Sequence, residues 1–198
     1  MKKIPTLFER EFKNGKVVGI TDKVHPGMEW VLEGKGEATI KKDGSCCAII
    51  NGELYKRYDA KKGRKAPDGA IPCCEPDPIT GHHPHWVQVD KDAPENRWLM
   101  DAYKTSFMFH RGFLEDGTYE AYGPAFNANP ENARWNQLYR HGTQKLRHCP
   151  RDFEGIKEYL RTCPIEGVVF WKDGEPKCKI KRSDFGFEWP VRYDCAKD

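Results

Sequence analysis

Asn-Gly and Asp-Gly dipeptides punctuate the chain, and short runs of β-compatible residues adjoin them. They include the pairs at 14–15, 43–44, 51–52, 116–117 and 173–174. Asparagine, aspartate and glycine tolerate the left-handed backbone conformation that tight hairpin turns require. This pattern constrains the fold more than any other feature, because it predicts antiparallel strands joined by short turns.

A lysine stands at the end of one of these runs. Residues 37–40 are β-compatible, Lys41 follows them, and Asp43-Gly44 precedes a second apolar run at 45–51. We expect a hairpin whose turn is Asp43-Gly44 and whose first strand aims Lys41 into a cleft. Side chains alternate between the two faces of a strand, so Lys42 should face away from that cleft. A solvated hairpin turn in a lysine-rich protein is the alternative interpretation.

Basic residues follow the next predicted strand. Residues 53–58 should form this strand, which the Asn51-Gly52 turn opens. The basic side chains at and beyond its end are Lys56, Arg57, Lys61, Lys62, Arg64 and Lys65. They form either the exposed face of a solvated loop or an edge that holds phosphate groups.

Periodicity and turn residues predict the remaining elements. The first of two helices should turn Trp98 and Ala102 inward, and the second should pack in the core. The strands are expected at 16–20, 28–32, 86–89 and 165–171, the helices at 94–103 and 151–161, and a long ordered loop at 66–94.

The last predicted strand carries alternating lysines. Lys177, Lys179 and Lys181 should share one face of it, which leaves Cys178 and Ile180 to pack on the other. A solvated face is the simpler interpretation of three alternating lysines.

Composition narrows the class of protein. The chain has 198 residues, a charged fraction of 32% and a formal net charge of +3, so no global positive field marks a nucleic-acid binder. No apolar run approaches the roughly 18 residues that a membrane-spanning helix needs, and no export signal is evident. We expect a cytoplasmic protein that makes no membrane contact and forms a single domain over residues 1–198.

Cysteines and histidines raise the question of a zinc site. Without an export signal, the eight cysteines are expected to be reduced thiols. Cys73 and Cys74 precede His82, His83 and His85. Because neither a C-x₂-C nor an H-x₃₋₅-H spacing is present, we expect no stoichiometric zinc.

Five short motifs occur in one order along the chain. They are Lys-x-Asp-Gly at 41–44, an arginine at 57, a glutamate between tyrosines at 119–122, Glu-Gly-Val-Val at 166–169 and Lys-x-Lys at 179–181. This order resembles motifs I, Ia, III, IV and V of the covalent nucleotidyltransferases, the superfamily of ATP-dependent DNA ligases, RNA ligases and mRNA capping enzymes. The stretches YEAYGP, DFEGIKEYL, EGVVFW and KIKRSDFGFEWP resemble in particular the small stand-alone 5′-3′ RNA ligases.

The resemblance implies a fold. The fold class would be α+β, a nucleotidyltransferase adenylation domain whose antiparallel sheets and flanking helices surround an ATP cleft. The residues after 181 are too few for the OB-fold that DNA ligases and capping enzymes carry, so we expect no OB-fold domain.

The resemblance also implies roles for the motif residues. Lys41 would be the nucleophile that takes AMP. Lys179 and Lys181 would bind the α-phosphate and disfavour the charged form of the Lys41 amine. The other nucleotide-binding residues would be Thr39, Ile40, Arg57 on a phosphate, Glu120 on the ribose, Phe126 on adenine and Glu166 on the metal, while Arg64 and Lys65 would hold RNA.

The implied activity is the sealing of RNA 5′-phosphate and 3′-hydroxyl ends. It would use ATP with Mg²⁺ or Mn²⁺, proceed through lysyl-AMP and an adenylated RNA end, and require only a monomer. Two alternatives stay open at this point. One is a guanylyltransferase that uses GTP, and the other is a catalytically silent RNA-binding module with the same fold.

Overall fold

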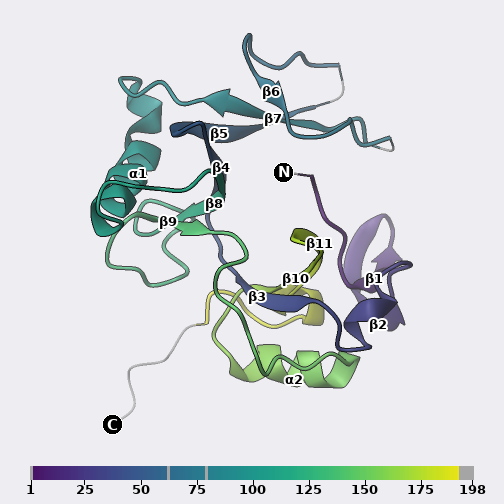
Figure 1. Ribbon diagram of the computed structural model, residues 1–198. Helices are drawn as coiled ribbons and strands as arrows, with labels where there is room; N and C mark the ends of the chain where they lie inside the picture. Colours follow the sequence, from purple (N-terminus) through teal and green to yellow (C-terminus); the bar gives the residue numbers. More distant parts are fainter. Residues whose placement is uncertain (1, 62, 79, 192–198) are drawn as a thin grey trace. The chain divides into compact units, whose positions relative to one another are not determined.

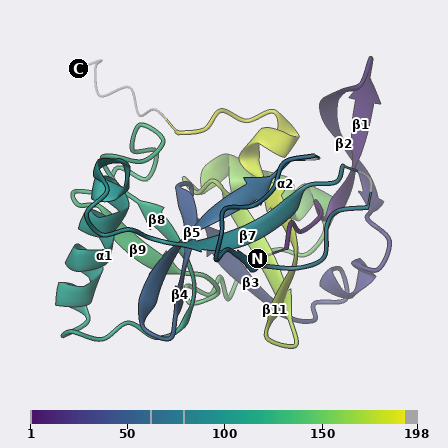
Figure 2. The same ribbon diagram turned by 90° about the horizontal axis from the view of Figure 1, so that it is seen from above.

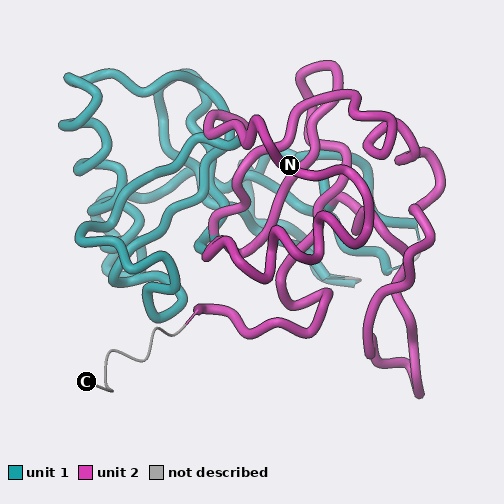
Figure 3. The backbone as a smooth tube through the Cα atoms, turned by 90° about the horizontal axis from the view of Figure 1, so that it is seen from below, with its two compact units in different colours: residues 1–3, 43–141 teal, residues 4–42, 142–198 magenta. Residues whose placement is uncertain are grey.

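The computed structural model describes residues 2–61, 63–78 and 80–191. The chain divides into two compact units (Figure 3). Unit 1 comprises Met1–Lys3 and Asp43–His141, and unit 2 comprises Ile4–Lys42 and Gly142–Asp198. The organisation of residues 1–198 as a single domain stays a prediction.

Unit 1 is built on an antiparallel sheet of six strands, in the order β6-β7-β5-β4-β8-β9 (Figure 1). The strands are β4 (Ser45–Ile50), β5 (Glu53–Ala60), β6 (Ile71–Pro72), β7 (His83–Gln88), β8 (Gly117–Tyr122) and β9 (Gln137–Arg140). Thus β6 and β7 lie within the region predicted as a long loop. The predicted strand at 86–89 is confirmed in part by β7, which begins earlier, at His83.

Helix α1 (Arg97–Phe109) completes the core of unit 1. It buries Met100, Ala102 and Ser106, and the Ser106 hydroxyl accepts the backbone N–H of Leu138 on β9 at 2.7 Å. The prediction that Ala102 faces inward is confirmed. The same prediction for Trp98 is wrong, because this side chain lies in the first turn and is 46% exposed.

Unit 2 contains two smaller sheets. Strands β1 (Phe8–Lys13) and β2 (Lys16–Val24) pair side by side as an antiparallel two-stranded ribbon (Figure 2). Strands β3 (Glu37–Lys41), β10 (Gly167–Lys172) and β11 (Glu175–Lys181) form a three-stranded sheet with β10 in the centre.

Helix α2 (Phe153–Thr162) packs into the core of unit 2. The side chain of Asp152 caps it by accepting the N–H of Gly155 at 2.8 Å. Ile156 and Leu160 are fully buried in the cluster that also contains apolar residues of β3, β10 and β11. The predicted core helix at 151–161 is therefore confirmed.

Three of the predicted turns are hairpins with left-handed backbone at their first residue. Asn14, Asn51 and Asp173 have φ values of 52°, 52° and 54°, and each is followed by a glycine with positive φ. These turns join β1 to β2, β4 to β5 and β10 to β11.

The predicted hairpin at Asp43-Gly44 is wrong. Strand β3 pairs with β10, whereas β4 pairs with β5 and β8, so the two strands on either side of Asp43-Gly44 belong to different sheets. The boundary between the units falls directly before Asp43. Gly44 is required for another reason, because a Cβ atom there would lie 2.1 Å from the carbonyl oxygen of Ala121.

The predicted strand at 28–32 is also wrong. Glu29–Val31 is a 3₁₀ helix, and Trp30 and Val31 are both buried. Neighbouring residues of a strand point to opposite faces, so a strand could not easily turn both side chains into one core.

The fold class expected from the resemblance needs correction. The described part of the chain contains eleven strands in antiparallel sheets but only two α-helices, one in each unit. The predicted α+β nucleotidyltransferase adenylation domain, with helices flanking its sheets, is therefore wrong, and the architecture is mostly β. No helix among the described residues has the length and apolar character needed to cross a membrane.

Candidate functional site

The residues predicted to form the site divide between the two units. Those in unit 2 are Thr39, Ile40, Lys41, Glu166, Lys179 and Lys181, and those in unit 1 are Arg57, Arg64, Lys65, Glu120 and Phe126.

Unit 2 brings two of the predicted lysines into one row across its three-stranded sheet. Gly167 on the central strand pairs with Lys41 on β3 and with Lys181 on β11. Two residues further along β10, Val169 pairs with Thr39 on one side and with Lys179 on the other. Lys41, Lys179 and Lys181 therefore lie on neighbouring positions of the same sheet, and Gly167 places no side chain between Lys41 and Lys181.

Glycine is required at position 167 by the packing of the strands. A Cβ atom there would lie 2.2 Å from the carbonyl oxygen of Ile180 and 2.9 Å from the Cα atom of Lys181. The glycine of the Glu-Gly-Val-Val motif therefore has a steric role in this sheet that is independent of any chemistry.

Glu166 connects the lysines. Its Oε2 atom lies 2.5 Å from Nζ of Lys41, and its Oε1 atom lies 3.9 Å from Nζ of Lys181. The Glu166 side chain is only 9% exposed. A carboxylate so buried needs a cationic partner, and Lys41 provides the closer one.

The third lysine of the group is electrostatically unusual. Burial lowers the pKa of Lys179 from its ordinary value of 10.5 to about 8, with smaller contributions from the positive charges of Lys41 and Lys181. Glu166 opposes this shift. A cluster of three lysines around one carboxylate has an excess of positive charge, which favours the binding of an anion such as a phosphate.

Thr39 and Ile40 lie beside this cluster, but their polar groups are engaged within unit 2. Thr39 is 1% exposed, and its hydroxyl donates to the carbonyl oxygen of Val169 and accepts the indole N–H of Trp171 at 2.8 Å. The N–H of Ile40 donates to the carbonyl oxygen of Gln144. Both residues therefore hold the strand that ends at Lys41.

In unit 1, Glu120 is part of a hydrogen-bonded group that the sequence did not predict. Its Oε2 atom lies 3.1 Å from Nε2 of His141, and Nδ1 of the same ring lies 3.0 Å from the Thr118 hydroxyl. The side chains of His141 and Glu120 are 15% and 13% exposed. No signal in the sequence links His141 to Glu120, because the two residues meet only through the pairing of β8 with β9.

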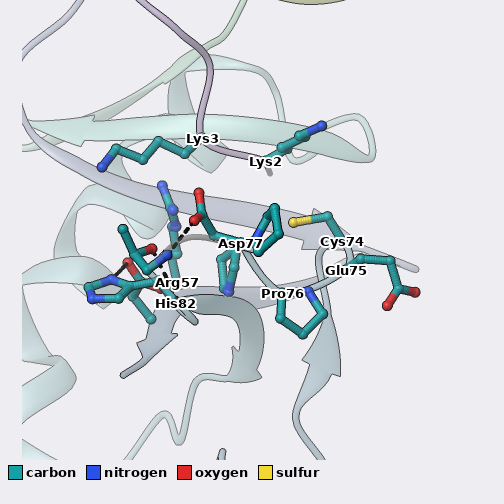
Figure 4. A pocket seen from close by; sticks show the side chains of 12 residues that line it. Lys2, Lys3, Arg57, Cys74, Glu75, Pro76, Asp77 and His82 are labelled. Carbon is teal, nitrogen blue, oxygen red and sulfur yellow. Dashed lines mark hydrogen bonds and ion pairs between the residues drawn. The ribbon is translucent and has the colours of Figure 1, made fainter. Parts of the chain in front are cut away.

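Arg57 projects from β5 into a pocket of unit 1 with a volume of about 460 Å³ (Figure 4). Its Nε atom is buried and has no hydrogen-bond partner among the described residues. Lys2 and Lys3 also line this pocket. A buried donor without a partner carries a free-energy cost that a ligand oxygen would remove.

The other predicted residues of unit 1 have different surroundings. Phe126 is 8% exposed and packs in the hydrophobic core, where its ring stabilises the unit. Arg64 and Lys65 are exposed in the connection between β5 and β6.

Asp43 has partners that the Lys-x-Asp-Gly pattern did not predict. Its carboxylate accepts the side-chain amide of Asn127 at 2.8 Å, and its backbone N–H donates to Glu131 at 3.1 Å. These contacts anchor the first residue of the long segment of unit 1.

No model of a protein family matches the chain, and a search of curated proteins likewise found no match.

Proposed function

We propose that this protein is an ATP-dependent RNA ligase in which Lys41 accepts AMP from ATP and passes it to an RNA 5′-phosphate. The observation that carries the proposal is the cluster of Lys41, Lys179 and Lys181 around Glu166. The order of the sequence motifs supports the choice of nucleotidyl transfer over other uses of an anion-binding lysine cluster.

The first step would form a P–N bond and break a P–O bond. The Lys41 amine, after loss of a proton, attacks the α-phosphorus of ATP, and pyrophosphate leaves. Lys179 and Lys181 hold the α-phosphate, and their charge stabilises the oxygens that become more negative in the transition state. Lys179, with its pKa of about 8, can release or accept a proton near neutral pH.

The later steps would return lysine to its starting form. An oxygen of the RNA 5′-phosphate attacks the lysyl-AMP phosphorus, the P–N bond breaks and the Lys41 amine regains a proton. The 3′-hydroxyl of a second end then attacks the activated 5′-phosphate, loses its proton and releases AMP.

Mg²⁺ would neutralise charge on the leaving pyrophosphate when it is bound. The described residues contain no group of three or more His, Cys, Asp or Glu side chains that could hold a metal. Mg²⁺ is commonly held by one or two carboxylates together with substrate phosphates. Glu166 fits that type of site, in which the metal arrives on the nucleotide.

Labelling with α-³²P-ATP and Mg²⁺ tests the proposal. Lys41→Ala should abolish label on the denatured chain, whereas the neighbouring variant Lys42→Ala should retain it. The label should be released by acid and resist base, as expected for a phosphoramidate. Label that persists on Lys41→Ala would exclude this nucleophile, and label only from α-³²P-GTP would favour a guanylyltransferase.

A further inference from the structure

Helix α1 of unit 1 (Figure 1) ends in a group of exposed apolar side chains, which we call the aromatic tip. The tip consists of Phe107, Met108, Phe109 and Phe113, whose exposed fractions lie between 39% and 72%. Large apolar side chains that are exposed close together commonly mark an interaction surface, because their contact with water is unfavourable. We propose that the aromatic tip inserts into the surface of a lipid bilayer that carries anionic headgroups.

Hydrogen bonds and packing hold the aromatic tip in place. Arg111 has a left-handed backbone with a φ of 56°, and the N–H of Gly112 donates to the carbonyl oxygen of Phe107 at 2.8 Å. The N–H of Arg111 donates to the carbonyl oxygen of Met108 at 3.1 Å, which completes a Schellman cap. The Phe107 ring stacks on Tyr103 with ring centroids 5.8 Å apart. The exposed side chains therefore belong to a capped helix end.

Positive charge accompanies the aromatic tip. Lys104 precedes Phe107 and Met108 at helical spacing, so these side chains lie on one side of α1. Residues 102–114 contain no aspartate or glutamate. Within the described ranges, neither Lys104 nor Arg111 forms an ion pair. Glycine or asparagine is usual at the position of Arg111 in such a cap, so an arginine there adds a charge beside the tip at a steric cost.

The carboxylates that flank this segment are engaged elsewhere in unit 1. Asp101 accepts the side-chain amide of Asn136 at 2.7 Å, and Glu115 forms an ion pair with Arg140. Asp116 accepts two backbone N–H groups of the turn between β4 and β5. These carboxylates therefore do not neutralise Lys104 and Arg111.

A fluid anionic bilayer suits this surface better than other anionic partners. A folded protein would need a pocket fitted to each protruding side chain, whereas lipid chains close around any shape. RNA bases stack on aromatic rings, but Met108, the most exposed member of the tip, has no ring. A two-fold contact between two copies of the chain would place the like charges of Lys104 and Arg111 near one another. Binding at the bilayer surface requires no membrane-spanning helix.

Flotation of the protein with lipid vesicles tests the inference. Vesicles of phosphatidylcholine alone are compared with vesicles that also contain phosphatidylserine. The wild type should bind the anionic vesicles more tightly by about tenfold or more, because basic side chains near an anionic surface are attracted to it. This preference should shrink as the salt concentration rises. Equal binding to both kinds of vesicle, or binding to neither, would overturn the proposal.

A pair of aromatic variants separates the tip from aromatic exposure in general. Phe109→Ser with Phe113→Ser should weaken binding to the anionic vesicles by about tenfold or more, because the phenylalanine rings supply most of the inserted apolar surface. Trp98→Ser with Trp135→Ser removes two half-exposed rings outside the tip and should bind as the wild type does. Undiminished binding of the first variant, or an equal loss in both, would refute the role of the tip.

Arg111→Gly separates the charge from the structure of the helix end. Glycine adopts the left-handed conformation without steric cost, so Tm should stay the same or rise. The preference for anionic over neutral vesicles should nevertheless fall severalfold. An unchanged preference would overturn the assignment of the tip to an anionic surface.

The other possible occupants are tested with the Phe109→Ser, Phe113→Ser variant. Sedimentation velocity shows whether it has lost a self-association of the wild type, and fluorescence anisotropy shows whether it has lost affinity for a single-stranded oligoribonucleotide. Either loss, without vesicle binding by the wild type, would assign the tip to that partner and overturn the inference.

The inference is independent of the proposed ligase activity. Without vesicles, the Phe109→Ser, Phe113→Ser variant should form lysyl-AMP to the same extent as the wild type. If the wild type forms no lysyl-AMP but binds anionic vesicles through the tip, the proposed activity fails while this inference stands. A thermal melt of each variant confirms that it is folded.

Discussion

Replacing Lys179 with methionine should stabilise the fold near neutral pH while abolishing the formation of lysyl-AMP. Burial lowers the pKa of Lys179 to about 8 from an ordinary 10.5, with help from the charges of Lys41 and Lys181. The folded chain therefore binds the Lys179 proton more weakly than the unfolded chain does. Methionine keeps a long apolar side chain and has no charge to bury.

The magnitude follows from the displacement of the pKa. A change of one in the pKa of a group corresponds to about 1.4 kcal/mol of free energy. The lowering of the Lys179 pKa from 10.5 to about 8 therefore corresponds to roughly 3 kcal/mol of unfolding free energy. Because Lys179 is only partly buried and solvent screens its charge, we expect about 2 kcal/mol. For a chain of this length such a gain should raise Tm by roughly 4 to 8 °C.

The pH dependence has a definite sign. Between about pH 8 and 10.5 the unfolded state binds more protons at this site than the folded state does, so wild-type stability should rise with pH across this window. The advantage of Lys179→Met should be full below about pH 8 and should shrink as the pH rises. Urea denaturation at several pH values measures it.

A neighbouring lysine provides the control. Lys177 lies on the same strand, and its amine is 2.5 Å from the exposed Glu175 carboxylate. Lys177→Met should therefore change the free energy of unfolding little at any pH. A destabilised Lys179→Met, or a difference from wild type that does not vary with pH, would refute the reasoning.

Three further predictions concern packing, a buried cation and RNA. Gly44→Ala should destabilise the chain by about 2 kcal/mol or more in urea denaturation, because the added methyl group would meet a backbone carbonyl oxygen at 2.1 Å. Gly19→Ala, whose methyl group would have only an ordinary contact at 3.4 Å, is the control and should change stability little. Arg182→Leu should cost about 3 kcal/mol in the same assay, since the buried guanidinium donates to three backbone carbonyl oxygens that would lose their partner. Arg64→Ala with Lys65→Ala should preserve lysyl-AMP formation and slow RNA sealing. The slope of the logarithm of the RNA-binding constant against the logarithm of the salt concentration should fall in magnitude by about 0.7 per lost phosphate contact. Equal slopes for the variant and the wild type would show that this loop does not hold RNA.

The sequence alone determined the elements that depend on local chemistry. The turns at Asn14, Asn51 and Asp173 could be predicted because their residue types tolerate positive φ. The core helix could be predicted from apolar residues at helical spacing, whereas its first residue, Phe153, and the cap that Asp152 provides came only from the structure. Alternation along β11 likewise predicted that Cys178 and Ile180 would be buried opposite the lysines.

Only the tertiary structure decided which strands pair. A turn between Lys41 and Ser45 is locally plausible, but β3 pairs with β10, whose sequence lies more than one hundred residues away. Local propensity cannot distinguish these partners, because the deciding energy comes from burying Ala38, Val168 and Phe170 in one core. The predicted fold class was wrong for a different reason, because the described residues contain eleven strands and only two α-helices.

The candidate site shows the same division. The order of motifs identified Lys41, Glu166 and Lys179 from the sequence, although it could not show that one carboxylate would contact Lys41 at 2.5 Å. The partnership of His141 with Glu120 and the lowered pKa of Lys179 required the structure as well. Distances and burial arise from side chains that are remote in the sequence, and they set the electrostatics of a site, whereas residue type and spacing determine only which groups are available to it.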